Sequence, residues 1–233
     1  MKIRILASIA LTLAVLAAVA LWTLGTLLPR MRPKSPLEKA AVSGSLEELR
    51  REVRVMGGVD AMDGHGFTPL DWAARTGRTD VIAELVREGA DPDLRDDGPN
   101  GWAPLHHAVH KGHLEAVRAL LAAGAHVDAA ATRSNGITPL MLACAQGEPE
   151  IVNALLAAGA EPHVRQRGEE TALTYAMTTG NRRVIEALLR KAPDLRLTDS
   201  WEGGLARLLA RMRGQSDILA RLDHPSKQPE AAR

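Results

Sequence analysis

Four histidines crowd one short stretch of the chain, and their spacing could support metal chemistry. His106, His107, His110 and His113 lie within eight residues. His106 and His110 are one helical turn apart, a spacing that can hold Zn²⁺. No cysteine or carboxylate completes an obvious set of four ligands. We therefore expect no metal site here.

The other reactive side chains are isolated. Cys144 is the only cysteine, which excludes an intrachain disulfide, and in a helix face it would be an inert, small apolar residue. Asp71 stands beside Trp72, but one carboxylate with no base or nucleophile in register makes no active site. The chain has no G-x-S-x-G motif, P-loop or dinucleotide fingerprint. We expect neither enzymatic activity nor a cofactor.

A repeated pattern of 33–35 residues sets the positions of all these side chains. Four segments can be aligned with one another, at residues 68–74, 103–109, 138–144 and 171–177. A glycine follows each segment, and the spacings are 35, 35 and 33 residues between Gly77, Gly112, Gly147 and Gly180. Weaker copies lead to Gly44 and Gly214. Six copies in phase indicate a solenoid.

Each copy encodes a pair of helices. Thr68 and Thr138 precede a proline, so the threonine can cap a helix whose first position tolerates proline. The following glycine ends that helix where a positive φ is needed. A second helix keeps apolar residues at i, i+3 and i+4, and a polar hairpin leads to the next copy. The pattern predicts an all-α solenoid of helix-turn-helix repeats.

The middle four copies closely resemble the ankyrin-repeat family. Its T-P-L-H-x-A signature stands nearly intact as Ala103-Pro104-Leu105-His106-His107-Ala108. The resemblance implies structural hydrogen bonds for His106 and His113. It covers residues 35–222. The predicted repeats, of which the first and last are polar caps, span 35–62, 63–97, 98–132, 133–165, 166–198 and 199–222; we call them repeats 1 to 6. Residues 223–233 are expected to be a disordered tail.

A long apolar segment precedes the repeats. Residues 5–28 contain 24 positions without a charge, and a helix of that length spans about 36 Å, more than the ~30 Å bilayer core. A short basic segment (1–4) precedes it, and a basic linker (29–34) follows. We expect an uncleaved transmembrane anchor. The alternative is a signal peptide cleaved after the small-x-small motif Ala18-Val19-Ala20.

The basic residues on the two sides of this segment are nearly equal in number, so they do not determine its orientation in the membrane. Lys2 and Arg4 lie before the segment, and Arg30, Arg32 and Lys34 lie after it. Both the anchor and the signal peptide would export the repeats. We therefore expect a single-pass protein of a bacterial inner membrane with its repeats in the periplasm. A soluble periplasmic protein and a cytoplasmic-facing domain remain alternatives.

The charge distribution gives no reason to expect nucleic-acid binding. Residues 1–34 carry five basic side chains and no acidic one, so the remaining residues carry −4 within a total of +1. A mildly acidic repeat domain does not attract phosphates.

In the ankyrin fold, hairpin tips and the exposed ends of the first helices form a concave contact surface. The residues expected there are His65, Phe67, Arg75, Thr76, Asn100, Trp102, His110, Lys111, Asn135, Ile137, Gln146, Arg167, Glu170, Thr178 and Thr179. Phe67, Trp102 and Ile137 occupy the same place in three consecutive repeats. Such a row either marks an interaction site or packs against neighbouring hairpins. Two extra residues in the 96–101 hairpin favour contact.

These features predict a monomeric, membrane-tethered module that binds another protein. Three alternatives stay open: an immunity-type binder that neutralises an effector enzyme, an accessory factor for a periplasmic stress-defence enzyme, and a structural spacer. The fold alone does not identify the partner.

Overall fold

The computed structural model describes residues 35–167, 169–197 and 201–223, which form α-helices joined by loops, with no strand among them. The helices are α2 (Pro36–Ser43), α3 (Leu46–Met56), α4 (Pro69–Thr76), α5 (Thr79–Arg87), α6 (Pro104–His110), α7 (Leu114–Ala122), α8 (Pro139–Gln146), α9 (Pro149–Ala157), α10 (Ala172–Thr179), α11 (Arg182–Lys191), α12 (Trp201–Met212) and α13 (Ser216–Asp223). The prediction of an all-α repeat fold is confirmed.

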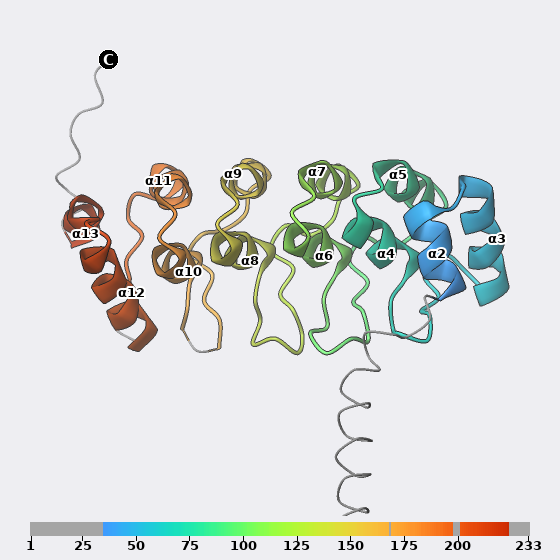
Figure 1. Ribbon diagram of the computed structural model, residues 1–233, viewed down its shortest axis with the longest axis horizontal. Helices are drawn as coiled ribbons and strands as arrows, with labels where there is room; N and C mark the ends of the chain where they lie inside the picture. Colours follow the sequence, from blue (N-terminus) through green and yellow to red (C-terminus); the bar gives the residue numbers. More distant parts are fainter. Residues whose placement is uncertain (1–34, 168, 198–200, 224–233) are drawn as a thin grey trace, which may run out of the picture. The chain divides into compact units, whose positions relative to one another are not determined.

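The helices form two parallel rows within the compact unit Pro36–Arg233 (Figure 1). The first helices α4, α6, α8 and α10 lie in one row, and the second helices α5, α7, α9 and α11 lie in the other. Hairpin loops extend from the first-helix row on the side away from the second helices. Each helix of repeats 2 to 4 contacts the corresponding helix of the next pair, and α10 contacts α12. The apolar core therefore runs continuously between the rows.

Capping residues fix where the first helices begin and end. Thr68 and Thr138 accept hydrogen bonds from the N–H groups of Asp71 and Met141, and a proline follows each threonine. Glycine ends these helices with a left-handed backbone, as at Gly77, where φ is 73°. A β-carbon there would approach the His113 ring to 2.9 Å. Both the backbone and the close approach therefore require glycine.

Equivalent positions of successive repeats are buried in the apolar core. One leucine and one alanine of each first helix are buried in repeats 2 to 5: Leu70 and Ala73, Leu105 and Ala108, Leu140 and Ala143, Leu173 and Ala176. The second helices bury β-branched residues and a leucine, such as Val81, Ile82 and Leu85. Small alanines in the first row let neighbouring helices approach closely.

Side chains that follow the repeat glycine join adjacent repeats. His113 Nε2 donates to the carbonyl oxygen of Arg75 at 3.1 Å. Asn181 Nδ2 and Gln215 Nε2 each donate to the glycine carbonyl of the preceding repeat at 2.8 Å. Each bond satisfies a carbonyl at a helix end, so one contact both caps a helix and fixes the repeat register.

The terminal repeats depart from two expectations. Gly44 has no positive φ, unlike the repeat glycines that follow it. The expectation that the end repeats are polar outside is wrong at Val55, Leu208 and Met212, whose exposed fractions are 74%, 53% and 76%. No following repeat covers α12 within the described residues, so Leu208 and Met212 face solvent.

The predicted basic segment 1–4, membrane segment 5–28 and linker 29–34 lie outside the described residues. Asp223 ends α13, and the rest of the predicted tail, 224–233, also lies outside them. None of the described helices is long and apolar enough to cross a membrane.

Candidate binding surface

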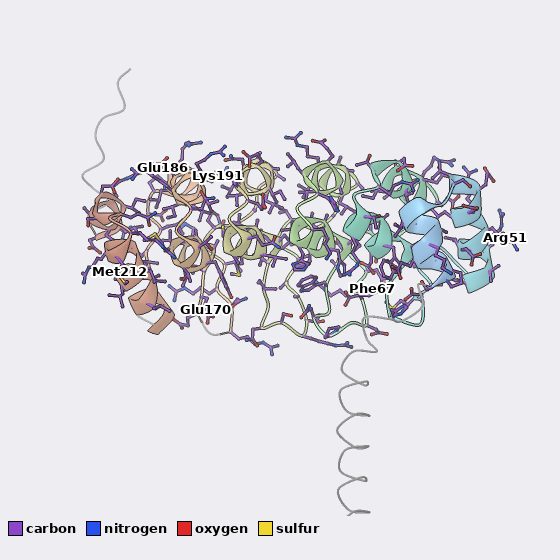
Figure 2. The ribbon with its side chains drawn as sticks, viewed as in Figure 1. Arg51, Phe67, Glu170, Glu186, Lys191 and Met212 are labelled. Atoms are coloured by element: carbon purple, nitrogen blue, oxygen red, sulfur yellow. The ribbon has the colours of Figure 1, made fainter. Side chains whose placement is uncertain are left out.

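The expected contact residues lie on the hairpins and at the C-terminal ends of α4, α6, α8 and α10. We call this surface the first-helix face. Figure 2 places Phe67 and Glu170 on its hairpin side, whereas Glu186 and Lys191 lie on the opposite side of the domain, on α11.

These residues differ in exposure. The exposed ones are His110, Lys111, Asn135, Gln146, Arg167, Thr178 and Thr179. The half-buried ones are His65, Phe67, Arg75, Thr76, Asn100, Ile137 and Glu170. Trp102 is buried, with 9% of its surface exposed. The face is therefore an uneven surface with an apolar floor beneath polar and basic side chains.

The expectation that Trp102 is an exposed contact is wrong. Its ring stacks on His106 with centroids 6.1 Å apart and meets the edge of His107 at 5.2 Å. Phe67 and Ile137, at the same place in their repeats, pack partly against the core. The Trp102 ring therefore packs on the first helix of its own repeat, α6.

In repeats 2 and 5 a side chain at the hairpin base bonds to its own first helix, a contact that sequence reasoning missed. Asp63 accepts from Trp72 Nε1 at 2.9 Å, and Gln166 Oε1 accepts from Tyr175 Oη at 2.9 Å. The repeats share one backbone bond at this base: the donors are Asp63, Asp96, Ala131 and Gln166, and the acceptors are the carbonyls of Phe67, Trp102, Ile137 and Glu170. Aligning the repeats at the hairpin base would have revealed these equivalent positions.

In repeat 3 the corresponding contact is a buried histidine–carboxylate pair. His107 Nε2 lies 2.7 Å from Asp96 Oδ2, and His107 Nδ1 lies 3.3 Å from Arg75 Nη1. Because arginine can only donate, Nδ1 must accept and Nε2–H must donate to Asp96. His107 is therefore neutral, in agreement with a pKa lowered mainly by burial and opposed by the Asp96 hydrogen bond. Burial acts to raise the pKa of Asp96, but the hydrogen bond and charge of His107 hold it below its usual value.

Arg75 connects this buried pair to the surface. Its guanidinium lies 4.9 Å from the centre of the Phe67 ring and 5.3 Å from the centre of the Trp72 ring. Cation–π contacts of this kind hold the guanidinium over the rings and stabilise it. Asp96, His107 and Arg75 thus form a chain of contacts from a hairpin base to the first-helix face.

Asp71 takes the capping role that a histidine has in repeat 3. Its Oδ2 accepts from the N–H and the hydroxyl of Thr68, both at 2.9 Å. Its Oδ1 is buried without a hydrogen-bond partner and lies 3.9 Å from His107 Nε2. Burial raises the pKa of Asp71 to about 7, although the Thr68 hydrogen bonds oppose that shift.

The four histidines of the 106–113 stretch have separate partners. His106 accepts from the Ala103 N–H at 3.3 Å and meets the Ile137 carbonyl at 3.1 Å, and burial lowers its pKa to about 4. His110 instead contacts the Gln146 amide. Among the described residues no group of three or more histidine, cysteine or acidic side chains could hold a metal ion. Burial raises the pKa of the Cys144 thiol, which keeps it protonated.

Family models match this part of the chain. The model for ankyrin repeats in three copies matches residues 82–166 and 128–199, and the single ankyrin-repeat model matches residues 65–97. The chain belongs to the ankyrin-repeat family. A search of curated proteins finds no match. Ankyrin repeats are typically non-enzymatic, and this ankyrin domain is a protein–protein interaction module.

Proposed function

We propose that this ankyrin protein is a membrane-tethered module that holds a partner protein against the first-helix face, without catalysis. The face comprises the ends of α4, α6, α8 and α10 with the hairpins that precede them. Residues 5–28 tether the domain, and the domain and its partner share the periplasm of a bacterium.

The observation that carries this proposal is a contrast among the repeats themselves. Buried positions of the first helices are the same from repeat to repeat, as with Leu70 and Leu105. The position just before the glycine, which is exposed in repeats 3 to 5 and half-buried in repeat 2, carries three residue types: Thr76, Lys111, Gln146 and Thr179. Packing explains the repeated leucine, whereas a common fold does not require threonine, lysine and glutamine to alternate at one surface position. Distinct side chains on a common framework are what recognition of one partner needs.

The tether is supported by the sequence of residues 5–28. A stretch of 24 residues without a charge is long enough to cross a bilayer. Basic residues on both sides, such as Arg4 and Arg30, would anchor its ends at the headgroups.

A bulky substitution on the first-helix face tests the proposal. Ala145 at the end of α8 is exposed, and Ala157 at the end of α9 is exposed on the second-helix row of the same repeat. The full chain is crosslinked in its own membranes and purified with its partner. We expect Ala145→Tyr to reduce partner recovery at least tenfold, because the ring occupies the contact surface, and Ala157→Tyr to leave recovery unchanged.

Exposed alanines suit this test better than the aromatic residues of the face. Trp102 is buried and Phe67 packs on the core, so truncating either would create a cavity and lower stability by roughly 3 kcal/mol. Equal recovery with both tyrosine variants would place the partner elsewhere and contradict the proposal.

A further inference from the structure

His107 connects the interior of repeat 3 to the surface of repeat 2 through its two ring nitrogens. Nε2 lies 2.7 Å from Asp96 Oδ2, and Nδ1 lies 3.3 Å from Arg75 Nη1. The ring of His107 is 2% exposed, whereas Arg75 is half-buried in the last turn of α4. A change of charge on this buried ring would therefore act on a side chain of the first-helix face.

The contact between His107 and Arg75 exists only while the imidazole is neutral. A guanidinium has donors and no acceptor, so it needs the lone pair of Nδ1. A proton on Nδ1 replaces that lone pair with a second donor and gives the ring a positive charge. Two donors of like charge only 3.3 Å apart repel one another. Protonation of His107 therefore breaks its contact with Arg75.

The charged and titratable groups that face His107 come from α4, α6 and a hairpin base. Asp71 and Arg75 lie on α4. Asp96 lies at the hairpin base, and His110 follows on α6 and acts to lower the pKa of His107. Asp71 Oδ1 lies 3.9 Å from His107 Nε2 and has no hydrogen-bond partner. Carboxyl groups therefore surround Nε2, and the cation that an imidazolium displaces is Arg75.

Arg75 is free to turn toward water once this contact is broken. Its guanidinium lies 4.9 Å from the centre of the Phe67 ring and 5.3 Å from the centre of the Trp72 ring. Because Arg75 is half-buried at a helix end, its head can reach solvent without crossing the core. The contact with His107 holds the guanidinium in one place over the rings, and without it the side chain gains rotamer freedom.

The buried groups of this cluster take up protons in a defined order. Burial raises the pKa of Asp71 to about 7. Burial also lowers the pKa of His107 below its ordinary 6.5, against the opposing effect of Asp96. As the pH falls, Asp71 is protonated first and His107 follows at a more acidic pH. At neutral pH His107 is therefore unprotonated and holds Arg75.

We infer that protonation of His107 is a switch that releases Arg75 and so changes the first-helix face at repeats 2 and 3. The inference rests on the proposed function and adds its regulation: the domain holds its partner at neutral pH and releases it at acid pH. The direction follows from preorganisation, because a side chain that is already fixed loses less conformational freedom when a partner binds.

The ring nitrogens of His107 report the switch directly in nuclear magnetic resonance spectra. The full chain is labelled with nitrogen-15 in histidine and arginine and studied in detergent micelles, and His107→Gln and Arg75→Met identify the signals. We expect a proton on Nε2 alone at about pH 7.5, protons on both nitrogens at acid pH, and a change of the Arg75 signal over the same range. A proton on Nδ1 at about pH 7.5, or a ring that stays neutral wherever the chain is folded, overturns the switch.

Recovery of the partner tests the regulation. Membranes that hold the full chain are equilibrated at about pH 7.5 or about pH 5 and treated with a photo-activated crosslinker. We expect recovery to fall at least fivefold at the lower pH for the native chain. It should fall less than twofold for His107→Gln, which stays neutral and keeps a donor for Asp96. His163→Gln is the matched control, because His163 is exposed, and it should respond to pH like the native chain.

Arg75→Met keeps the test valid if His107→Gln does not fold. It removes the guanidinium that moves, so its recovery should change less than twofold between the two pH values. An acid loss that persists in folded His107→Gln or in Arg75→Met overturns the switch, as does recovery of the native chain that is the same at both pH values. Either result leaves the first-helix face as the contact surface. The proposed function fails separately, if Ala145→Tyr leaves recovery unchanged at about pH 7.5.

Discussion

At the scale of single residues, the first-helix face rests on buried polar groups. Asp96, His107 and Arg75 form a connected set in which one neutral imidazole donates to a carboxylate and accepts from a guanidinium. Asp71 lies next to this set, with an oxygen 3.9 Å from the same imidazole. Two carboxylates therefore approach one neutral histidine inside the protein, where an unpaired charge is costly.

The raised pKa of Asp71 predicts a pH-dependent stability. Its pKa is about 7 in the folded protein against an ordinary 3.8, so between those values the folded state binds more protons than the unfolded state. The stabilising contribution of the protonated form is complete below about pH 4 and is lost as the pH rises through 7. Asp71→Asn, which stays neutral, should therefore raise the free energy of unfolding by roughly 1–3 kcal/mol at pH 8.

Urea unfolding at several pH values measures this difference. We expect the gain from Asp71→Asn to shrink toward zero at pH 4. Asp80→Asn is the matched control, because Asp80 is exposed and pairs with Arg78, and it should change stability by less than about 1 kcal/mol at pH 8. A gain from Asp71→Asn that is the same at pH 4 and pH 8 would contradict the raised pKa.

The candidate site was only partly predictable from single residues. The positions on the face follow from the 33–35-residue spacing of the repeats. The burial of Trp102 does not follow from it, because that burial depends on the rings of His106 and His107 that pack against it. The Asp96–His107 pair was also missed. Its members are 11 residues apart on a hairpin and a helix, and only the folded hairpin brings them together.

At the scale of elements, helix ends do two tasks. A side chain that follows the repeat glycine caps its own helix and joins the neighbouring repeat. Asn181 shows both, since its Oδ1 accepts from the N–H groups of Arg183 and Val184 and its Nδ2 donates to the Gly147 carbonyl at 2.8 Å. The helices and their ends were predictable because threonine, proline and glycine act locally. The inter-repeat bonds were not, because they join residues more than 30 positions apart.

Two substitutions at Asn181 separate these tasks. Asn181→Ala loses the cap and the inter-repeat bond, and should lower the free energy of unfolding by roughly 2 kcal/mol. Asn181→Asp keeps a capping oxygen but loses the donor to Gly147, so its loss should be about half as large. Equal stability of Asn181→Ala and the native chain in urea unfolding would refute the double role.

At the scale of the whole molecule, the domain is a row of repeats in which each is stabilised mainly by its neighbours. The periodic sequence was sufficient to predict this architecture. The periodic sequence did not predict the exposure of Leu208 and Met212 in the last repeat. These side chains are exposed because a terminal repeat has a neighbour on one side only. The proposed tether would confine such a row to one membrane face and so limit its partners to one compartment.

The side of the membrane can be measured with a reporter enzyme. Alkaline phosphatase fused after Arg233 needs disulfides that form outside the cytoplasm, so we expect the fusion to be active. A control fusion carrying Leu13→Arg and Leu16→Arg places two charges in the apolar segment and should be inactive, because charges oppose insertion. An inactive native fusion at normal protein level would contradict the periplasmic location.

The most direct test of the account is hydrogen exchange of the full chain with and without its captured partner. We predict slower exchange on binding in residues 64–76, 98–111, 133–146 and 166–179, which carry the first-helix face. Exchange in residues 79–87, 114–122 and 149–157, which form second helices, should not change. Protection confined to the second helices, with the first-helix face unaffected, would contradict the claim that this ankyrin domain binds its partner there.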